Sequence, residues 1–133
     1  MKISDYTDYR AEEVLALYEA AGWTNYLRRA EALPAAFRGS LCVLCARDDG
    51  KLIGLLRAVG DGVSILFVQD LLVLPDYRRR GIASALMREL LARYPEVYQL
   101  ELLTDDTPQT RAFYSSLGFR AAEELGCTAF VRM

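Results

Sequence analysis

The sequence contains no histidine among its 133 residues. This absence excludes Ser-His-Asp and Cys-His nucleophilic sites and any metal site built on imidazole. Proton transfer in this chain must therefore use a carboxylate, a phenol, a lysine, a thiol, the backbone or water. We expect no metal cofactor.

Cysteine is also scarce, with Cys42, Cys45 and Cys127 as the three examples. An odd number of cysteines, behind an N-terminus without an apolar signal-like segment, predicts reduced thiols in the cytoplasm. Cys42 and Cys45 form a C-x-x-C pattern within the apolar run LCVLCA. Residues three apart on a strand point to opposite faces, which favours packing over a shared metal or redox site.

Long apolar runs and excess positive charge are missing as well. No apolar segment approaches the roughly 20 residues that span a bilayer, so we expect no membrane partner. The net charge of −2 disfavours nucleic acid as the main partner. A nucleic-acid-binding domain built on the single basic cluster, Arg78–Arg80, is the weakest alternative. The hydrophobic fraction of 53% allows a real core within one domain, residues 1–133.

The spacing of apolar residues predicts the order of the secondary structure. Helices are expected at Ala11–Ala21, Arg29–Arg38, Gly81–Tyr94 and Pro108–Leu117. Strands are expected at Lys2–Thr7, Leu41–Arg47, Leu52–Val59, Val63–Leu74, Val97–Leu103, Phe119–Leu125 and Thr128–Met133, the last two as an antiparallel pair. This order predicts an α/β (α+β) fold with a mixed, mostly antiparallel central sheet of about seven strands and helices on both faces.

One segment joins a strand to a helix through a basic turn. Arg78, Arg79 and Arg80 precede Gly81, and small residues, Ala83 and Ser84, follow in the first helical turn. A helix N-terminus presents unpaired N–H groups and partial positive charge, which together suit phosphate. Three arginines at that end oppose the helix dipole unless an anion binds. The segment predicts an anion site that is neither a P-loop nor a dinucleotide fingerprint; the alternative is a solvated basic turn.

The run Arg78-Arg79-Arg80-Gly81-Ile82-Ala83 resembles the acyl-CoA-binding motif R/Q-x-x-G-x-G/A of the GCN5-related N-acetyltransferase (GNAT) superfamily. A second run, Ala112–Phe119, resembles another signature of that family, and the element order agrees along the whole chain. The resemblance implies a single GNAT domain over residues 1–133. It also implies transfer of an acetyl group from acetyl-CoA to a primary amine of a small molecule or peptide, by direct attack in a ternary complex. Many relatives have Asn where Thr107 stands here, so a hydrogen bond near the pantetheine is expected to differ.

The resemblance also implies how the cofactor is held. The pyrophosphate would lie on the turn before the helix, mostly on backbone N–H groups, and the pantetheine would pair with the end of the long strand. A splay between that strand and Val97–Leu103 would free the edge that the cofactor needs. Plain core packing of the strand's side chains is compatible with this interpretation. The implied cofactor-binding residues are Leu71, Leu72, Val73, Arg78, Arg79, Arg80, Gly81, Ile82, Ala83, Ser84 and Thr107.

Two residues are implied to be catalytic. Tyr114 matches the family tyrosine that protonates the departing thiolate; its alternative is a core tyrosine. Asp70 follows Gln69 where similar polyamine acetyltransferases have a Glu-Asp pair. Because Gln69 takes up no proton, Asp70 is expected to hold the amine or order a water relay, with a structural capping role as an equal alternative. The general base stays open.

The acceptor side of the family lies at the loop between the first two helices. Here Trp23 and Tyr26 would wall the amine site or simply cover the core. Asp105 is implied to face the same neighbourhood as Gln69, whereas Asp106 is expected to cap the helix that begins at Pro108. Relatives often form homodimers. A non-catalytic module that binds or senses acyl-CoA is the second function considered.

Overall fold

The computed structural model describes residues 1–133, which form two compact units, Met1–Leu103 and Thr104–Met133. The first unit contains the whole sheet and the second contains two short helical segments. No helix in the chain is long and apolar enough to cross a membrane.

The sheet of the first unit has five strands in the order β1-β2-β3-β4-β5. The strands are β1 (Lys2–Asp5), β2 (Cys42–Asp48), β3 (Lys51–Gly60), β4 (Ile65–Val73) and β5 (Gln99–Leu102). All neighbours pair antiparallel except β4 and β5, which are parallel. The mixed, mostly antiparallel sheet is therefore confirmed. Asp49 and Gly50 both have positive φ, as a two-residue turn between β2 and β3 requires.

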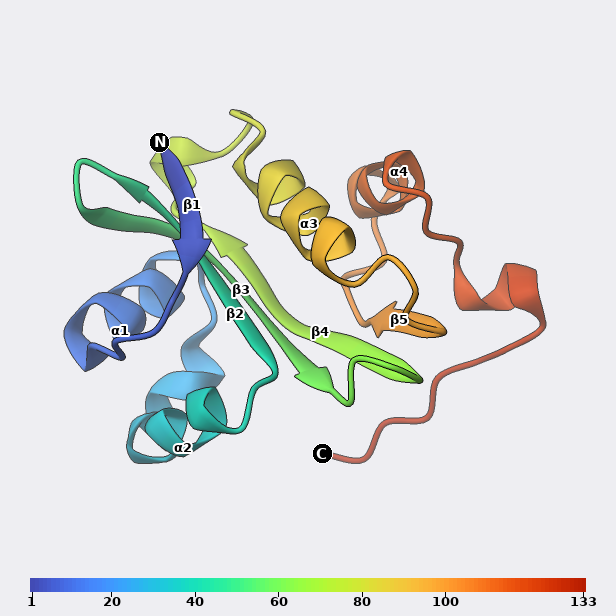
Figure 1. Cartoon of the computed structure of the whole chain (residues 1–133), viewed down its shortest axis with the longest axis horizontal. Helices are drawn as coiled ribbons and strands as arrows, with labels where there is room; N and C mark the ends of the chain where they lie inside the picture. Colours follow the sequence, from blue (N-terminus) through green and yellow to red (C-terminus); the bar gives the residue numbers. More distant parts are fainter. The chain divides into compact units, whose positions relative to one another are not determined.

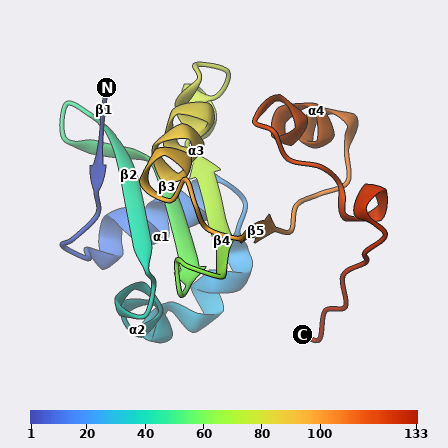
Figure 2. The same cartoon turned by 45° about the vertical axis from the view of Figure 1, so that its right-hand side comes forward.

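Helices cover both faces of this sheet (Figures 1 and 2). One face carries α1 (Ala11–Ala20), the 3-10 segment η1 (Thr24–Ala32) and α2 (Leu33–Arg38). The other carries α3 (Ile82–Arg93), which packs closely on β3 at Gly54. A Cβ on Gly54 would lie 3.1 Å from the Ile82 side chain.

The core between α1 and the sheet is apolar and aromatic. Its buried members are Tyr6, Val14, Leu17, Tyr18, Leu33, Phe37, Val43, Cys45, Leu52, Leu55 and Leu72. Cys42 and Cys45 are both buried and unpaired, as packing thiols would be.

Pro34 lies in the first turn of α2, where its missing N–H is tolerated. The helix predicted at Arg29–Arg38 therefore begins four residues later, at Leu33.

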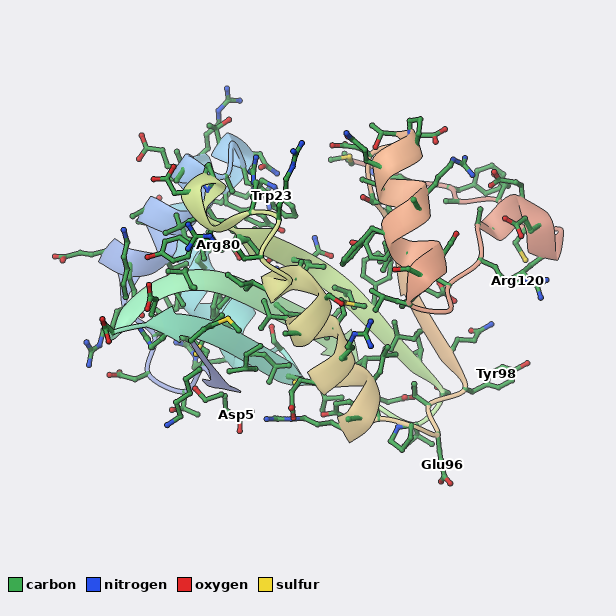
Figure 3. The ribbon with its side chains drawn as sticks, turned by 90° about the horizontal axis from the view of Figure 1, so that it is seen from above. Asp5, Trp23, Arg80, Glu96, Tyr98 and Arg120 are labelled. Carbon is green, nitrogen blue, oxygen red and sulfur yellow. The ribbon has the colours of Figure 1, made fainter.

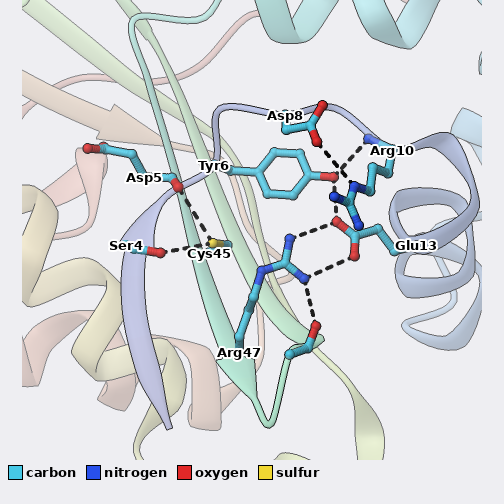
Figure 4. Close-up of polar contacts among 9 residues, drawn as sticks. Ser4, Asp5, Tyr6, Asp8, Arg10, Glu13, Cys45 and Arg47 are labelled. Atoms are coloured by element: carbon cyan, nitrogen blue, oxygen red, sulfur yellow. Dashed lines mark hydrogen bonds and ion pairs between the residues drawn. The ribbon is translucent and has the colours of Figure 1, made fainter.

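A charged cluster joins α1 to the β2–β3 hairpin (Figure 4). The Arg47 guanidinium donates to both Glu13 carboxylate oxygens at 3.0 and 2.9 Å, and the Tyr6 hydroxyl donates to Glu13 at 2.7 Å. Hydrogen bonds from Arg47, opposed by partial burial, hold the pKa of Glu13 below its ordinary value. Arg47 also donates to the Gly50 carbonyl at 3.0 Å, so the cluster fixes this end of the hairpin.

The second unit consists of α4 (Pro108–Ser116) and the 3-10 turn η3 (Ala122–Leu125). The predicted strand pair at Phe119–Leu125 and Thr128–Met133 was wrong, and the sheet has five strands rather than about seven. Residues 126–133 have no regular structure, and Phe130 is 97% exposed. The alternating pattern gives these segments β propensity, but a strand also needs a hydrogen-bonded neighbour and a surface to cover.

Candidate active site

The basic turn predicted to bind an anion lies between β4 and α3. A short 3-10 turn, η2 (Pro75–Tyr77), leads into the exposed arginines, and α3 begins directly after Gly81. Figure 3 labels Arg80 on this loop. Arg79 and Gly81 both have left-handed backbone conformations, with φ of 63° and 78°. A Cβ on Gly81 would meet nothing within 4 Å, so its dihedral angle, and not lack of space, favours glycine.

Backbone donors are free at the start of α3. The first bond of the helix runs from the Ala85 N–H to the Gly81 carbonyl at 2.9 Å, and no side chain caps this end. The N–H groups of Ile82, Ala83 and Ser84 therefore lack helical partners. The Ile82 side chain is buried, so that residue offers its backbone alone. The Ser84 hydroxyl accepts a hydrogen bond from Arg88 Nε at 3.1 Å. Ser84 therefore also offers its backbone N–H as the available group.

The turn is tied to the neighbouring hairpin. The Tyr77 hydroxyl donates to Asp48 at 2.9 Å, and the Arg80 guanidinium carbon lies 5.0 Å from the centre of the Tyr77 ring. A cation over an aromatic face is attracted by the ring quadrupole. Tyr77 therefore links the position of Arg80 to the end of β2.

Strand β4 has a free edge next to this turn. Its pairing with β5 extends from Ile65 to Val68 and stops there, whereas its pairing with β3 continues to Val73. Leu71, Leu72 and Val73 thus have β3 on one side and no β5 residue on the other. The predicted splay is present, and an extended ligand could pair there by strand addition. Leu72 and Val73 also pack in the core, as the compatible interpretation expected.

A bulge in β4 separates Gln69 from its neighbours. Asp70 pairs with Arg57 and Val68 pairs with Ala58, so Gln69 is the extra residue with no β3 partner. The Gln69 side chain is exposed, whereas Asp70 is fully buried. Two adjacent residues in the sequence therefore have opposite environments.

Asp70 lies in a buried polar cluster. Its carboxylate accepts from the Arg57 Nε at 2.7 Å, the Tyr18 hydroxyl at 2.6 Å and the Tyr26 hydroxyl at 3.0 Å. Arg57 is itself buried and donates to the Ser40 hydroxyl at 3.2 Å. Burial and the charge of Asp70 raise the pKa of Tyr18 far above its ordinary value, which keeps this phenol protonated. With no exposed surface and three donors, Asp70 has no direct access to an amine in this structure.

The aromatic residues predicted for the acceptor side are in contact with this cluster. The rings of Trp23 and Tyr26 are stacked at 13°, with centroids 6.2 Å apart, and the Tyr18 ring lies 4.9 Å from Tyr26. Gln69 donates from Nε2 to the Tyr26 hydroxyl at 3.1 Å. The structure therefore brings Trp23, Tyr26, Gln69 and Asp70 into one connected group.

The remaining predicted residues belong to the second unit. Tyr114 lies between Phe113 and Phe119, both in edge-on contact, and burial raises the pKa of its phenol. Thr107 is the N-cap of α4 and exchanges hydrogen bonds with Thr110 in a capping box. The cap is thus Thr107 and not Asp106.

The neighbouring aspartates differ from each other in their contacts. The Asp106 side chain pairs with Arg111 at 2.6 Å. Asp105 has an exposed side chain, and its carbonyl accepts from the Thr110 hydroxyl. Within the second unit, Asp105 is therefore the aspartate whose carboxylate is not engaged by an arginine.

Comparison of the sequence with known protein families identifies the family of this chain. The matched region includes β4, the basic turn before Gly81 and the segment around Tyr114. Residues 39–121 match the family model described as an acetyltransferase (GNAT) domain. The chain belongs to the GNAT acetyltransferase family. The match begins just before β2 and ends just before η3, so it includes the Gly81 turn and Tyr114 of this GNAT chain.

Solved structures and curated proteins agree with this assignment. A GNAT-family acetyltransferase from Streptococcus pneumoniae is 42% identical with a TM-score of 0.89, over 99% of this chain and 96% of that one. A GNAT acetyltransferase from Brucella melitensis in complex with acetyl-CoA shares the fold at 24% identity, with a TM-score of 0.71 over 90% of this chain and 82% of that one. Histone acetyltransferase TAP1 of Glycine max is 28% identical over 88% of this chain, which spans 54% of that protein.

Four residues of the site were missed by sequence reasoning. Arg57 and Tyr18 complete the buried cluster, and Tyr77 and Asp48 hold the basic turn. Arg57 carried a signal, because it is the only charged residue inside the apolar run Leu52–Val59. A charge in a buried strand needs a partner, and Asp70 is the matching charge on the adjacent strand. Tyr77 and Asp48 carried no comparable signal.

Proposed function

We propose that this GNAT acetyltransferase binds acetyl-CoA at the Gly81 turn and transfers the acetyl group to a primary amine of a small molecule or peptide. The observation that carries the proposal is the set of free N–H groups at the start of α3, beside three exposed arginines. Such a helix terminus stabilises a bound pyrophosphate through directed hydrogen bonds and the helix dipole.

The proposed path of the cofactor follows the backbone of the first unit. The pyrophosphate would contact the N–H groups of residues 82–84, with Arg79 and Arg80 adding charge. The pantetheine would extend along the free edge of β4 at residues 71–73. This arrangement uses only backbone groups for the extended part, as strand addition does.

Tyr114 is proposed to donate a proton to the thiolate as it leaves. Its raised pKa keeps the phenol protonated at neutral pH, as a proton donor requires. The acceptor amine would lie against Trp23 and Tyr26, with Gln69 as the polar candidate of the first unit. The family resemblance adds Asp105 as a further candidate for substrate binding. Asp70 is proposed to act through Tyr26, because its carboxylate is enclosed.

A calorimetric titration with coenzyme A tests the cofactor site directly. We expect binding to the wild type and about fivefold weaker binding to Arg80→Ala, which removes an exposed ionic contact worth up to about 1 kcal/mol. Arg28→Ala is the matched control, because Arg28 is exposed on η1 and outside the turn. Absence of heat with the wild type would overturn the proposal.

A turnover assay tests the role of Tyr114. Free thiol release from acetyl-CoA, with polyamines, aminoglycosides, amino acids and peptides as acceptors, should identify an acceptor class. Tyr114→Phe should lower kcat by 10²-fold or more, the low end of the range for acid–base groups, while the affinity for coenzyme A stays within about twofold. Lost affinity with unchanged kcat would contradict the assigned role.

The second candidate function is a module that binds acyl-CoA without transferring it. The enclosure of Asp70 and the glutamine at position 69 favour this alternative, since neither offers an accessible carboxylate at the end of the β4 bulge. Binding of coenzyme A without thiol release across the acceptor panel would support it.

A homodimer and a cytoplasmic location remain predictions. The three free cysteines suit a reducing compartment.

A further inference from the structure

The buried cluster around Asp70 determines which end of the exposed Gln69 amide faces Tyr26. Its centre is an ion pair between Arg57 and Asp70, whose side chains are 6% and 0% exposed. A charge pair with so little solvent contact needs hydrogen bonds to satisfy its remaining lone pairs, and Tyr18 and Tyr26 supply them. From Asp70, the cluster reaches the surface through Tyr26 and Gln69, whereas Arg57 connects to the partly exposed Ser40 on its other side.

Counting donors and acceptors sets the direction of each bond. An ionised carboxylate accepts only, so the single proton of the Tyr26 hydroxyl points to Asp70. Burial, opposed by the bond from Gln69 and reinforced by the charge of Asp70, raises the pKa of Tyr26 and keeps that proton in place. The Tyr26 oxygen must then accept from Gln69, so the NH₂ end of the amide faces inward.

The opposite end of the same amide is consequently free. With Nε2 held by Tyr26, Oε1 is the atom of the exposed Gln69 amide that has no hydrogen bond within the protein. Gln69 lies at the β4 bulge, two residues before the free edge at residues 71–73. The stacked rings of Trp23 and Tyr26 lie beside the bond that holds Nε2. A neutral amide oxygen without a partner in the protein is suited to an N–H donor.

We propose that the buried Arg57–Asp70 pair acts through Tyr26 to point Gln69 Oε1 at the acceptor nitrogen, and that the acceptor is a weakly basic amine bound in its neutral form. The inference rests on the acetyl transfer proposed above. Gln69 is the residue that touches the amine, and Tyr26 and Asp70 are positioning residues.

The chemical step follows from the neutrality of Gln69. An amide takes up no proton, so the amine loses its ammonium proton to water before it reaches the thioester. The nitrogen lone pair forms the new C–N bond, the C–S bond breaks, and its electron pair leaves on sulfur. Sulfur gains the Tyr114 proton, the phenolate regains one from water, and the nitrogen loses one to water. The products are an amide and a thiol.

This step favours one class of acceptor. Peptide α-amines, with a pKa of about 7.7–8.0, are appreciably neutral near pH 7.5, whereas a lysine-like amine near 10.4 is neutral in roughly one molecule per thousand. A site without a proton acceptor on Gln69 therefore selects amines of low basicity. Peptide N-termini are the natural members of that class.

The first test varies the basicity of the acceptor alone. Ring-substituted benzylamines have one shape and different amino pKa values, so kcat/KM can be followed against pH for each by thiol release at saturating acetyl-CoA. We expect the inflection of each profile to move with the pKa of that amine. An inflection at one pH for the whole series would reveal a protein base and overturn the inference.

Variants test the role of the cluster. Tyr26→Phe frees the Gln69 amide to turn, and should raise the KM for benzylamine about tenfold with the KM for acetyl-CoA within about twofold. Tyr9→Phe is the matched control, because the Tyr9 hydroxyl is buried in the same core without a hydrogen-bond partner. Equal effects of the two variants would contradict the inference. Gln69→Glu, checked for an intact fold by its melting temperature, should add an inflection common to all acceptors.

A binding measurement separates this inference from the proposed function. The side-chain ¹⁵N–¹H signals of Gln69, assigned by their loss in Gln69→Glu, should shift when benzylamine is added above its pKa to protein with coenzyme A. The shift should disappear in Tyr26→Phe. A shift without thiol release would preserve this amine site while the transfer proposal failed; no shift would overturn the site even if transfer occurred.

Discussion

Removal of Arg57 should produce a large loss of stability. Arg57→Met keeps most of the side-chain volume but leaves the Asp70 carboxylate fully buried without a countercharge. Breaking a buried pair in this way costs about 3–5 kcal/mol. Two tyrosine hydroxyls remain on Asp70, so we expect the lower half of that range, about 3–4 kcal/mol.

A companion variant identifies the cause. Urea unfolding of Arg57→Met and of the wild type measures the loss. The companion variant Arg47→Met breaks the pair with Glu13, whose side chains are 28% and 21% exposed, and should cost about 1 kcal/mol. A loss for Arg57→Met that is below 1 kcal/mol, or no larger than the loss for Arg47→Met, would refute the argument.

Three smaller predictions concern the turn and the hairpin cluster. Tyr77→Phe removes the bond to Asp48 but keeps the ring under Arg80, so calorimetry should show coenzyme A binding weakened about two- to tenfold without loss of melting temperature. Gly81→Ala should cost about 1–2 kcal/mol in urea unfolding, because φ is 78° there and nothing nearby would clash; a cost near zero would contradict the left-handed conformation. Glu13 has a lowered pKa when folded, so its contribution is present above its ordinary value of 4.5 and is lost as the pH falls below it. Glu13→Gln should therefore flatten the fall in stability between about pH 5 and 3, and an unchanged slope would place the acid-sensitive group elsewhere.

Most of the first unit was predictable from the sequence, because its signals are local. Alternation and turn residues located β2, β3 and β4, and the arginines before Gly81 marked the start of α3. Thr128–Met133 shows the limit of such signals: its pattern suits a strand, but pairing depends on a neighbour that the pattern cannot name.

The candidate site was predictable in its residue types and less so in their environments. Gln69 and Asp70 were both expected near the amine, yet only the pairing with β3 shows that one is exposed and the other enclosed. The contact of Tyr18 with Asp70 could not be predicted, for a related reason. It reads as an ordinary core residue of an amphipathic helix, and its role depends on a carboxylate 52 positions away in the chain.

The bulge at Gln69 reverses which residues of β4 point to each face of the sheet. Leu66 and Val68 pair with residues on the α3 side of β3, whereas Asp70 and Leu72 share a face with Arg57 and Leu55 on the α1 side. The stripe formed by every second residue from Leu66 to Leu72 therefore belongs to two different cores. Loss of one residue here would exchange the faces of half the strand, so this position should resist insertions and deletions more than the hairpin turns do.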